Sequence, residues 1–180
     1  MKQIIIVIDM QNGFTNSKNT KKLSDGISNL LQRNLFDVVI ATRFHNYKNS
    51  MYEKCLFWDK LQNEEEIRIT EQLEKYIDLI VDKRTYNCVN QEFIKKLCQL
   101  NEGEKPEKVF VVGVDTDCCV LTIATSLFEN GIRPVVLTQY VASNGGDDSH
   151  RAGLTVLKRL IGEKQLCNKD PMDLMELKKI

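Results

Sequence analysis

Four residues whose side chains can carry out chemistry each come shortly after a run of apolar residues. They are Asp9, Lys83 and the adjacent Cys118 and Cys119. A cysteine thiolate is a nucleophile, a nearby cation favours the thiolate over the thiol, and a carboxylate can accept the thiol proton and return it to a leaving amine. Placed together, these groups could cleave a small carbonyl compound by way of a thioester. Each also has an ordinary interpretation, since the acid could cap a turn, the lysine could be a solvated strand end, and the cysteines could be buried thiols.

The two cysteines are predicted to lie in the first turn of a helix. The run 109–112 has the β-branched and aromatic composition of a buried strand, and it stops at Gly113. Thr116 or Asp117 is a suitable N-cap for a helix whose apolar residues then recur at helical spacing. These apolar residues are Val120, Ile123, Ala124, Leu127 and Phe128. Unpaired backbone N–H groups and the helix dipole at such an N-terminus favour a thiolate and would lower the pKa of a cysteine there.

Apolar runs alternate with amphipathic segments along the whole chain. The runs cover residues 4–8, 37–42, 77–81, 109–112, 133–137 and 165–167. Uniformly apolar strands that alternate with helices predict an α/β fold of three layers, helices on both faces of a mostly parallel sheet, in one domain of residues 1–180. The carboxyl ends of parallel strands share one edge of a sheet, so Asp9, Lys83 and the cysteines are expected to meet there. The segment Ser50–Gln62 is predicted to be helical and is a candidate lid or interface element.

The composition of the chain indicates which kinds of binding partner and which cellular compartment to expect. The 180 residues contain 25 Lys plus Arg and 25 Asp plus Glu, so the formal charge is zero and nothing indicates nucleic acid or a membrane as a partner. The N-terminal apolar run is too short for a signal peptide. Six cysteines without regular spacing predict reduced thiols and a cytoplasmic protein rather than a disulfide framework.

Three motifs resemble those of the isochorismatase-like cysteine hydrolases, a family that includes nicotinamidases, N-carbamoylsarcosine amidases and isochorismatases. Residues 7–14 (VIDMQNGF) resemble the family's start, residues 83–86 (KRTY) its Lys-x-x-Tyr segment, and residues 113–120 (GVDTDCCV) its cysteine-bearing elbow. The resemblance implies a Rossmann-like fold with a six-stranded sheet. It also implies a catalytic triad of Asp9, Lys83 and Cys119, with Cys119 rather than Cys118 as the nucleophile.

The resemblance extends to the backbone and to the assembly. It implies a non-proline cis peptide bond between Val114 and Asp115, and backbone N–H groups of Asp115 and Cys119 that form an oxyanion hole. It further implies a homodimer or larger homo-oligomer, for which Ser50–Gln62 is a candidate contact.

The chain departs from the nicotinamidase pattern after its second predicted strand. Nicotinamidases bind a metal through an acid and two histidines there, whereas this chain has Phe44 in the place of the acid and a lone His45. We therefore expect no metal and no cofactor, a hydrogen-bonded structural role for His45, and an activity other than nicotinamidase. The acidic residues of the loop 145–148 are expected in the first turn of a helix rather than at a metal. The aromatic residues Phe14, Phe44, Trp58 and Tyr86 are candidates for an apolar substrate pocket, or else belong to the core.

The residues and the resemblance lead to one main hypothesis and one alternative. The main hypothesis is a cysteine hydrolase that cleaves a C–N bond of a small amide or carbamoyl substrate through a thioester on Cys119. The alternative is a catalytically idle or thiol-redox protein, with Cys118 and Cys119 as the redox pair, that binds a small molecule or a protein.

Overall fold

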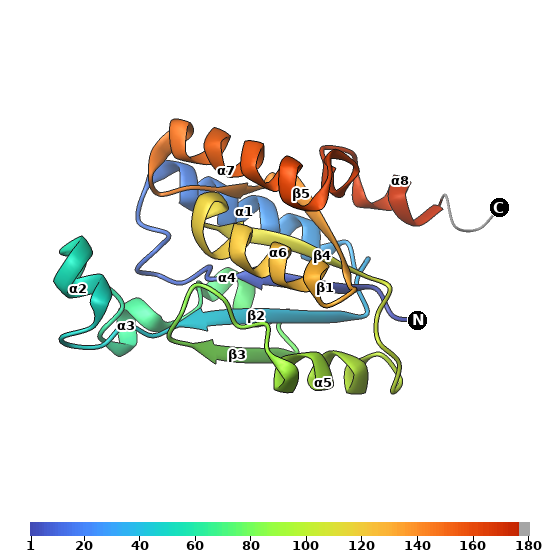
Figure 1. Cartoon of the computed structure of the whole chain (residues 1–180), viewed down its shortest axis with the longest axis horizontal. Helices are drawn as coiled ribbons and strands as arrows, with labels where there is room; N and C mark the ends of the chain where they lie inside the picture. Colours follow the sequence, from blue (N-terminus) through green and yellow to red (C-terminus); the bar gives the residue numbers. More distant parts are fainter. Residues whose placement is uncertain (177–180) are drawn as a thin grey trace.

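A six-stranded parallel sheet forms the centre of the protein. The computed structural model describes residues 1–176 of the chain. Its strands are β1 (Ile4–Ile8), β2 (Val38–Phe44), β3 (Leu79–Lys83), β4 (Lys108–Val114), β5 (Arg133–Ala142) and β6 (Leu166–Cys167). They lie in the order β3-β2-β1-β4-β5-β6, and every neighbouring pair is parallel (Figure 1). The predicted α/β fold with a parallel sheet is confirmed.

Helices cover both faces of this sheet. Alternate residues of β1 point to opposite faces, so Ile4, Ile6 and Ile8 belong to one core cluster while Ile5 and Val7 belong to the other. The first cluster is closed by α5 (Gln91–Leu100), α6 (Leu121–Glu129) and α7 (Gly146–Ile161), and the second by α1 (Lys18–Gln32) and α4 (Glu71–Glu74). The remaining helices are short: α2 (Met51–Leu56), α3 (Glu64–Ile67), a 3₁₀ turn at Glu163–Gln165 and α8 (Pro171–Glu176). Both faces of the sheet are thereby buried, as the uniformly apolar inner strands predict.

The strand order reverses its direction between β1 and β4. β2 and β3 lie on one side of β1 and β4 to β6 on the other, so the chain changes direction across the sheet between these two strands. Connections that leave the carboxyl ends at such a point diverge, and ligands of open α/β sheets bind in the gap. This edge lies at the left of Figure 1, where the arrowheads of β2 and β3 point and α2 projects.

Several predicted segments differ in extent from the structure; the strand predicted at 133–137, for example, is β5 and extends to Ala142. The third strand is Leu79–Lys83 rather than 77–81, and its exposure alternates because it is an edge strand with one face partly open to solvent. Only Met51–Leu56 of the segment Ser50–Gln62 is helical, because Phe57 adopts a left-handed conformation that ends the helix. The prediction of acidic residues in the first turn of a helix is confirmed, since Asp147 and Asp148 lie in the first turn of α7.

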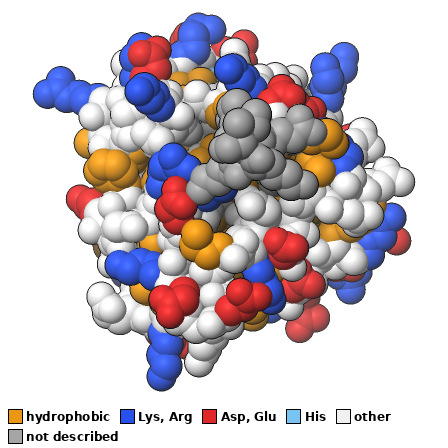
Figure 2. Space-filling model, turned by 90° about the vertical axis from the view of Figure 1, so that its right-hand side faces the viewer, with side chains coloured by type: hydrophobic (Ala, Val, Ile, Leu, Met, Phe, Trp, Pro, Cys, Tyr) orange, Lys and Arg blue, Asp and Glu red, His pale blue; other side chains and the backbone are white. Residues whose placement is uncertain are grey.

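At the opposite edge of the sheet, the described residues carry charges of both signs (Figure 2). Figure 2 views the molecule from the side of the amino ends of the strands, and lysine, arginine, aspartate and glutamate side chains are interspersed over that face. Within residues 1–176, no helix has the length and apolar character needed to cross a membrane.

Candidate active site

Asp9, Lys83 and Cys119 lie together at the carboxyl edge of the sheet. Lys83 is the last residue of β3, and its Nζ lies 2.7 Å from Oδ2 of Asp9 and donates a hydrogen bond of 3.2 Å to Sγ of Cys119. The ammonium group also donates to the backbone oxygen of Thr85 at 3.1 Å. The other oxygen of Asp9 accepts a hydrogen bond of 2.6 Å from Oγ1 of Thr42 on β2. A carboxylate, an ammonium group and a thiol from three separate strand ends therefore form one buried cluster.

The charges of this cluster determine where its proton lies. Burial opposes the charge of Lys83, but the carboxylate of Asp9 and the sulfur of Cys119 outweigh it and raise the pKa of the lysine. Burial and the negative charge of Asp9 raise the pKa of Cys119 well above its ordinary value, and Lys83 offsets this only in part. The single buried cation, Lys83, can neutralise only one of two possible anions, the carboxylate of Asp9 or the thiolate of Cys119. A carboxylic acid is a stronger acid than a thiol, so Asp9 is the group that carries the negative charge. Cys119 is therefore a thiol in the resting protein, and the prediction of a lowered cysteine pKa is wrong.

The segment that carries the cysteines is a π-helical turn of residues Thr116–Val120 in front of α6. The carbonyl oxygen of Asp115 accepts hydrogen bonds from the backbone N–H groups of Cys118 and Val120 at 3.0 and 3.1 Å. Neither Thr116 nor Asp117 acts as the predicted N-cap, because the turn begins after Asp115, whose side chain makes no cap hydrogen bond. The peptide bond between Val114 and Asp115 is cis, at the position that the family resemblance implied.

Close packing with neighbouring elements holds this turn in place. Gly153 of α7 lies against it so tightly that a Cβ atom there would come within 2.8 Å of Cα and N of Asp117. The hydroxyl of Thr116 shares a hydrogen bond of 2.8 Å with Nδ1 of His150, also on α7. At the end of β4, Gly113 has φ +116°, and a Cβ atom there would lie 2.1 Å from the carbonyl oxygen of Ile8. Helix α7 and strand β1 thus fix the turn relative to Asp9.

Cys119 lines a cavity of about 560 Å³ with mainly apolar walls, and Cys118 and Asp115 also line this cavity. The four aromatic residues that the sequence singled out, Phe14, Phe44, Trp58 and Tyr86, all line it. The Phe14 and Trp58 rings stack with centroids 5.6 Å apart, and Tyr52 meets the rings of Phe44 and Tyr86 edge to face at 5.1 and 5.3 Å. We call Phe14, Phe44, Tyr52, Trp58 and Tyr86 the aromatic wall.

Sequence reasoning missed three groups of this site. Tyr52 and Leu56 line the cavity, and their signal was the aromatic and apolar content of the segment Ser50–Gln62. Asn144 lines the same cavity and donates hydrogen bonds from its backbone and side-chain nitrogens, both 2.8 Å, to Oδ1 of Asp115. No local pattern joins residues 115 and 144, because they meet only where the loops after β4 and β5 pack together.

Buried amides on the same edge hold the wall in position. Gln11 follows β1, and its side chain accepts from the backbone N–H of Phe44 and donates to the carbonyl oxygen of Phe44, at 2.7 and 2.9 Å. Asn46 donates to the carbonyl oxygens of Trp58 and Lys60 at 3.1 and 3.0 Å. These bonds attach the loop that carries Trp58 to the end of β2.

The residues after β2 do not fit a metal. The ring of Phe44 is buried against the aromatic wall and lies 4.9 Å from Nζ of Lys83. His45 contacts Oδ1 of Asp82 through Nε2 at 2.6 Å, and neither residue lines the cavity of Cys119. Asp82 is in addition paired with Arg43, which holds the pKa of its carboxyl group below the usual value. Within the described chain no three His, Cys, Asp or Glu side chains are grouped as a metal would need.

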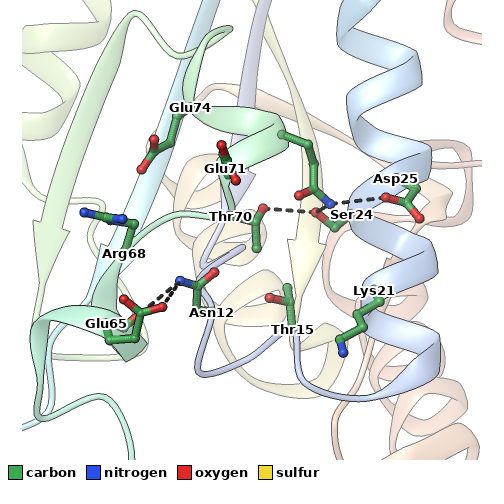
Figure 3. A pocket seen from close by; sticks show the side chains of 11 residues that line it. Asn12, Thr15, Lys21, Ser24, Asp25, Glu65, Arg68, Thr70, Glu71 and Glu74 are labelled. Carbon is green, nitrogen blue, oxygen red and sulfur yellow. Dashed lines mark hydrogen bonds between the residues drawn. The ribbon is translucent and has the colours of Figure 1, made fainter.

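A second cavity, of about 660 Å³, lies between α1, α3, α4 and the loop after β1. Its walls are polar and carry both signs of charge, including Lys21, Arg68, Glu65 and Glu71 (Figure 3). Ser24 and Thr70 already hydrogen-bond each other across it at 3.0 Å. Asp9, Lys83 and Cys119 are not among the residues that line it, so the cavity beside Cys119 is the candidate active site.

The chain matches one protein-family model and several solved structures. The model of the isochorismatase domain matches residues 3–167. No curated protein sequence matches the chain. An isochorismatase-like hydrolase from Alkaliphilus metalliredigens shares 20% identity at a TM-score of 0.73, over 89% of this chain and 92% of that one. A nicotinamidase from Bacillus subtilis shares 21% identity at a TM-score of 0.71, over 90% and 97%.

A third solved structure is the pyrazinamidase of Pyrococcus horikoshii in complex with zinc. It shares 18% identity with this chain at a TM-score of 0.75, over 89% of this chain and 97% of that one. These identities establish the fold alone, whereas the family model spans nearly the whole chain. The chain therefore belongs to the isochorismatase domain family.

Proposed function

We propose that the protein is a cysteine hydrolase that cleaves the C–N bond of a small amide or carbamoyl compound. The observation that carries the proposal is the position of Nζ of Lys83 between Oδ2 of Asp9 and Sγ of Cys119, at 2.7 and 3.2 Å, beside the cavity. Membership in a family of hydrolases supports the reaction class, and the nicotinamidase and pyrazinamidase among the solved structures act on amides by name.

The reaction begins with the proton of Cys119. Asp9 accepts this proton as the sulfur attacks the carbonyl carbon of the substrate, and Lys83 stabilises the developing thiolate. The backbone N–H groups of Asp115 and Cys119 donate to the oxyanion of the tetrahedral intermediate. Asp9 then returns the proton to the leaving nitrogen, the C–N bond breaks and a thioester remains. The raised pKa of Cys119 supports this order, because the thiol keeps its proton until a substrate is in place.

Water completes the reaction. A water molecule attacks the thioester carbonyl, Asp9 accepts its proton, and the collapse of the second intermediate releases an acid and restores the thiol of Cys119. The aromatic wall holds the substrate, and a cavity of about 560 Å³ suits a small molecule. The scheme uses only groups of this chain.

The thiol-redox alternative gains no support from the site. Thiol–disulfide exchange needs a reactive thiolate, yet burial raises the pKa of Cys118 to about 11 and that of Cys119 well above its ordinary value. Both thiols would be almost fully protonated at neutral pH.

The assembly and the compartment are part of the same proposal. Phe57 is 89% exposed at the tip of the α2 segment, and Met51 and Leu56 beside it are also exposed, which favours a homo-oligomer that buries this segment. Replacement of Phe57 by serine should then reduce the oligomer mass in light scattering. All six cysteines are free thiols, which supports a reducing compartment such as the cytoplasm.

A substrate panel with two cysteine variants tests the function. Purified protein is assayed with small amides, carbamoyl compounds and activated esters, and Cys119→Ala should abolish turnover while Cys118→Ala retains most of it. Mass spectrometry of wild type quenched during turnover of an activated ester should find the acyl group on the peptide that contains Cys119. Turnover that survives in Cys119→Ala and is lost in Cys118→Ala would contradict the assignment of the nucleophile.

A further inference from the structure

One carboxyl group of the cavity takes no part in the proposed chemistry. The side chain of Asp115 lines the cavity four residues before Cys119, and the two bonds from Asn144 to its Oδ1 fix its orientation. Among residues 1–176, its Oδ2 has no hydrogen-bond partner, and no ion pair neutralises the carboxyl group. A built and oriented carboxylate oxygen is therefore available to a ligand in the cavity.

The charges around Asp115 do not supply a counter-ion. Burial raises the pKa of Asp115 to about 6, and the nearby carboxylates of Asp117 and Asp9 act in the same direction, while the hydrogen bonds from Asn144 oppose the shift. The ammonium group of Lys83 is already paired with Asp9. Lys60 also lines the cavity, but it is a solvent-exposed side chain without an ion pair to Asp115. Asp115 is mainly ionised at neutral pH, so the cavity holds an uncompensated negative charge near the nucleophile.

The rest of the cavity favours the same kind of ligand. Aromatic rings attract a cation over their faces, and the attraction is strongest for tryptophan. The aromatic wall provides stacked and edge-to-face rings that line the same cavity as Asp115. Aromatic rings and a carboxylate that line the same cavity suit an ammonium group with apolar substituents. An anionic substrate would instead meet Asp115 as a like charge, and a plain apolar amide would leave Oδ2 of Asp115 desolvated without a partner.

We propose that the cavity selects amide or carbamoyl substrates that carry a positively charged nitrogen, which Asp115 pairs with and the aromatic wall encloses. The inference rests on the proposed function for the cleaved bond, but the cation site itself is a binding property. Asp115 is a specificity-determining residue through its side chain, independent of its backbone N–H.

A binding experiment tests the site without any turnover. Trp58 is the chain's only tryptophan and belongs to the wall, so its fluorescence reports directly on the cavity. Choline and 3,3-dimethylbutan-1-ol have the same shape and differ by a quaternary nitrogen in place of a carbon. Titration near neutral pH should give a dissociation constant about tenfold or more lower for choline than for the alcohol. Asp115→Asn should bring the two constants to within about twofold, because the amide keeps the shape without the charge.

A matched control separates this site from general surface charge. Asp148→Asn removes a carboxylate whose side chain is 96% exposed on α7, and it should leave the preference for choline unchanged. Equal binding of choline and the alcohol by wild type, or a preference that survives in Asp115→Asn, would overturn the proposal.

A kinetic experiment extends the test to the reaction. The trimethylammonium derivative of acetamide and 3,3-dimethylbutanamide form a second pair of equal shape, and wild type should favour the cationic amide by about tenfold or more in kcat/KM. Asp115→Asn should bring this ratio close to one. If choline binding depends on Asp115 but no amide is hydrolysed, the proposed function is wrong and the cation site is supported. If both amides are hydrolysed with equal kcat/KM, the proposed function is supported and the proposed preference for cationic substrates is wrong.

Discussion

Replacement of Lys83 by methionine should strongly destabilise the protein, because it leaves the carboxylate of Asp9 buried without its cation. The side chains of Lys83 and Asp9 are 2% and 0% exposed, and the charged atoms lie 2.7 Å apart. Methionine keeps much of the apolar stem of the lysine, so the change removes charge more than packing. The hydroxyl of Thr42 still binds the other carboxylate oxygen, but a hydroxyl cannot neutralise the charge.

The distance sets the size of the effect. At 2.7 Å, two unit charges attract by about 6 kcal/mol at an effective dielectric constant of about 20, before the loss of hydration is subtracted. Breaking a buried pair by removal of one partner costs about 3–5 kcal/mol, and we expect that loss for Lys83→Met. The double variant Asp9→Asn with Lys83→Met has no buried charge at this position. It should therefore be more stable than the sum of the two single losses predicts, by about 2–3 kcal/mol.

Urea unfolding of the four proteins, followed by circular dichroism, measures this coupling free energy. Lys96→Met is the matched control, because Lys96 pairs with Glu92 at the surface and its side chain is 44% exposed. The control should keep an unfolding midpoint close to that of wild type. If Lys83→Met unfolds at the same urea concentration as the control, the buried pair does not stabilise the fold. The same conclusion follows if the stability loss of the double variant equals the sum of the two single losses. Either result would refute the reasoning.

Three further predictions follow from the same region. The folded protein disfavours the charged form of Asp115, whose pKa is raised from 3.8 to about 6, so this cost is fully present above about pH 6 and disappears below about pH 4. Asp115→Asn should thus raise the free energy of unfolding by about 1–2 kcal/mol near neutral pH and leave it unchanged in acid, and a gain that persists in acid would refute this. Gly153→Ala places a Cβ atom 2.8 Å from backbone atoms of Asp117. This variant should lose about 1–3 kcal/mol of the free energy of unfolding in urea, together with most of the turnover. The control Gly26→Ala places its Cβ atom 3.9 Å from the nearest side chain and should be neutral or stabilising. Iodoacetamide should modify the exposed Cys55 before Cys119, since the pKa of Cys119 is raised, and peptide mass spectrometry that finds Cys119 modified first would contradict this.

The sequence by itself determined the fold and the meeting of the three reactive residues. Uniformly apolar strands that alternate with helices bury both of their faces in a parallel sheet covered by helices on each side. Parallel strands bring their carboxyl ends to one edge of the sheet. Asp9, Lys83 and Cys119 each follow or end such a run, so their convergence follows from strand direction alone. Four of the five residues of the aromatic wall were also recognisable, because they end or follow the same strands, whereas Tyr52 was missed.

Only the tertiary structure decided the protonation of the site and the character of the cavity. Sequence reasoning expected a lowered pKa for the cysteine from its helical position, but burial beside Asp9 outweighs Lys83 and reverses the direction. The charge in the cavity depends on Asp115 and Asn144, which lie 29 residues apart and meet through loop packing. Periodicity reports which face of an element is apolar, whereas a pKa and a binding cavity depend on the distances and desolvation that every packed element contributes.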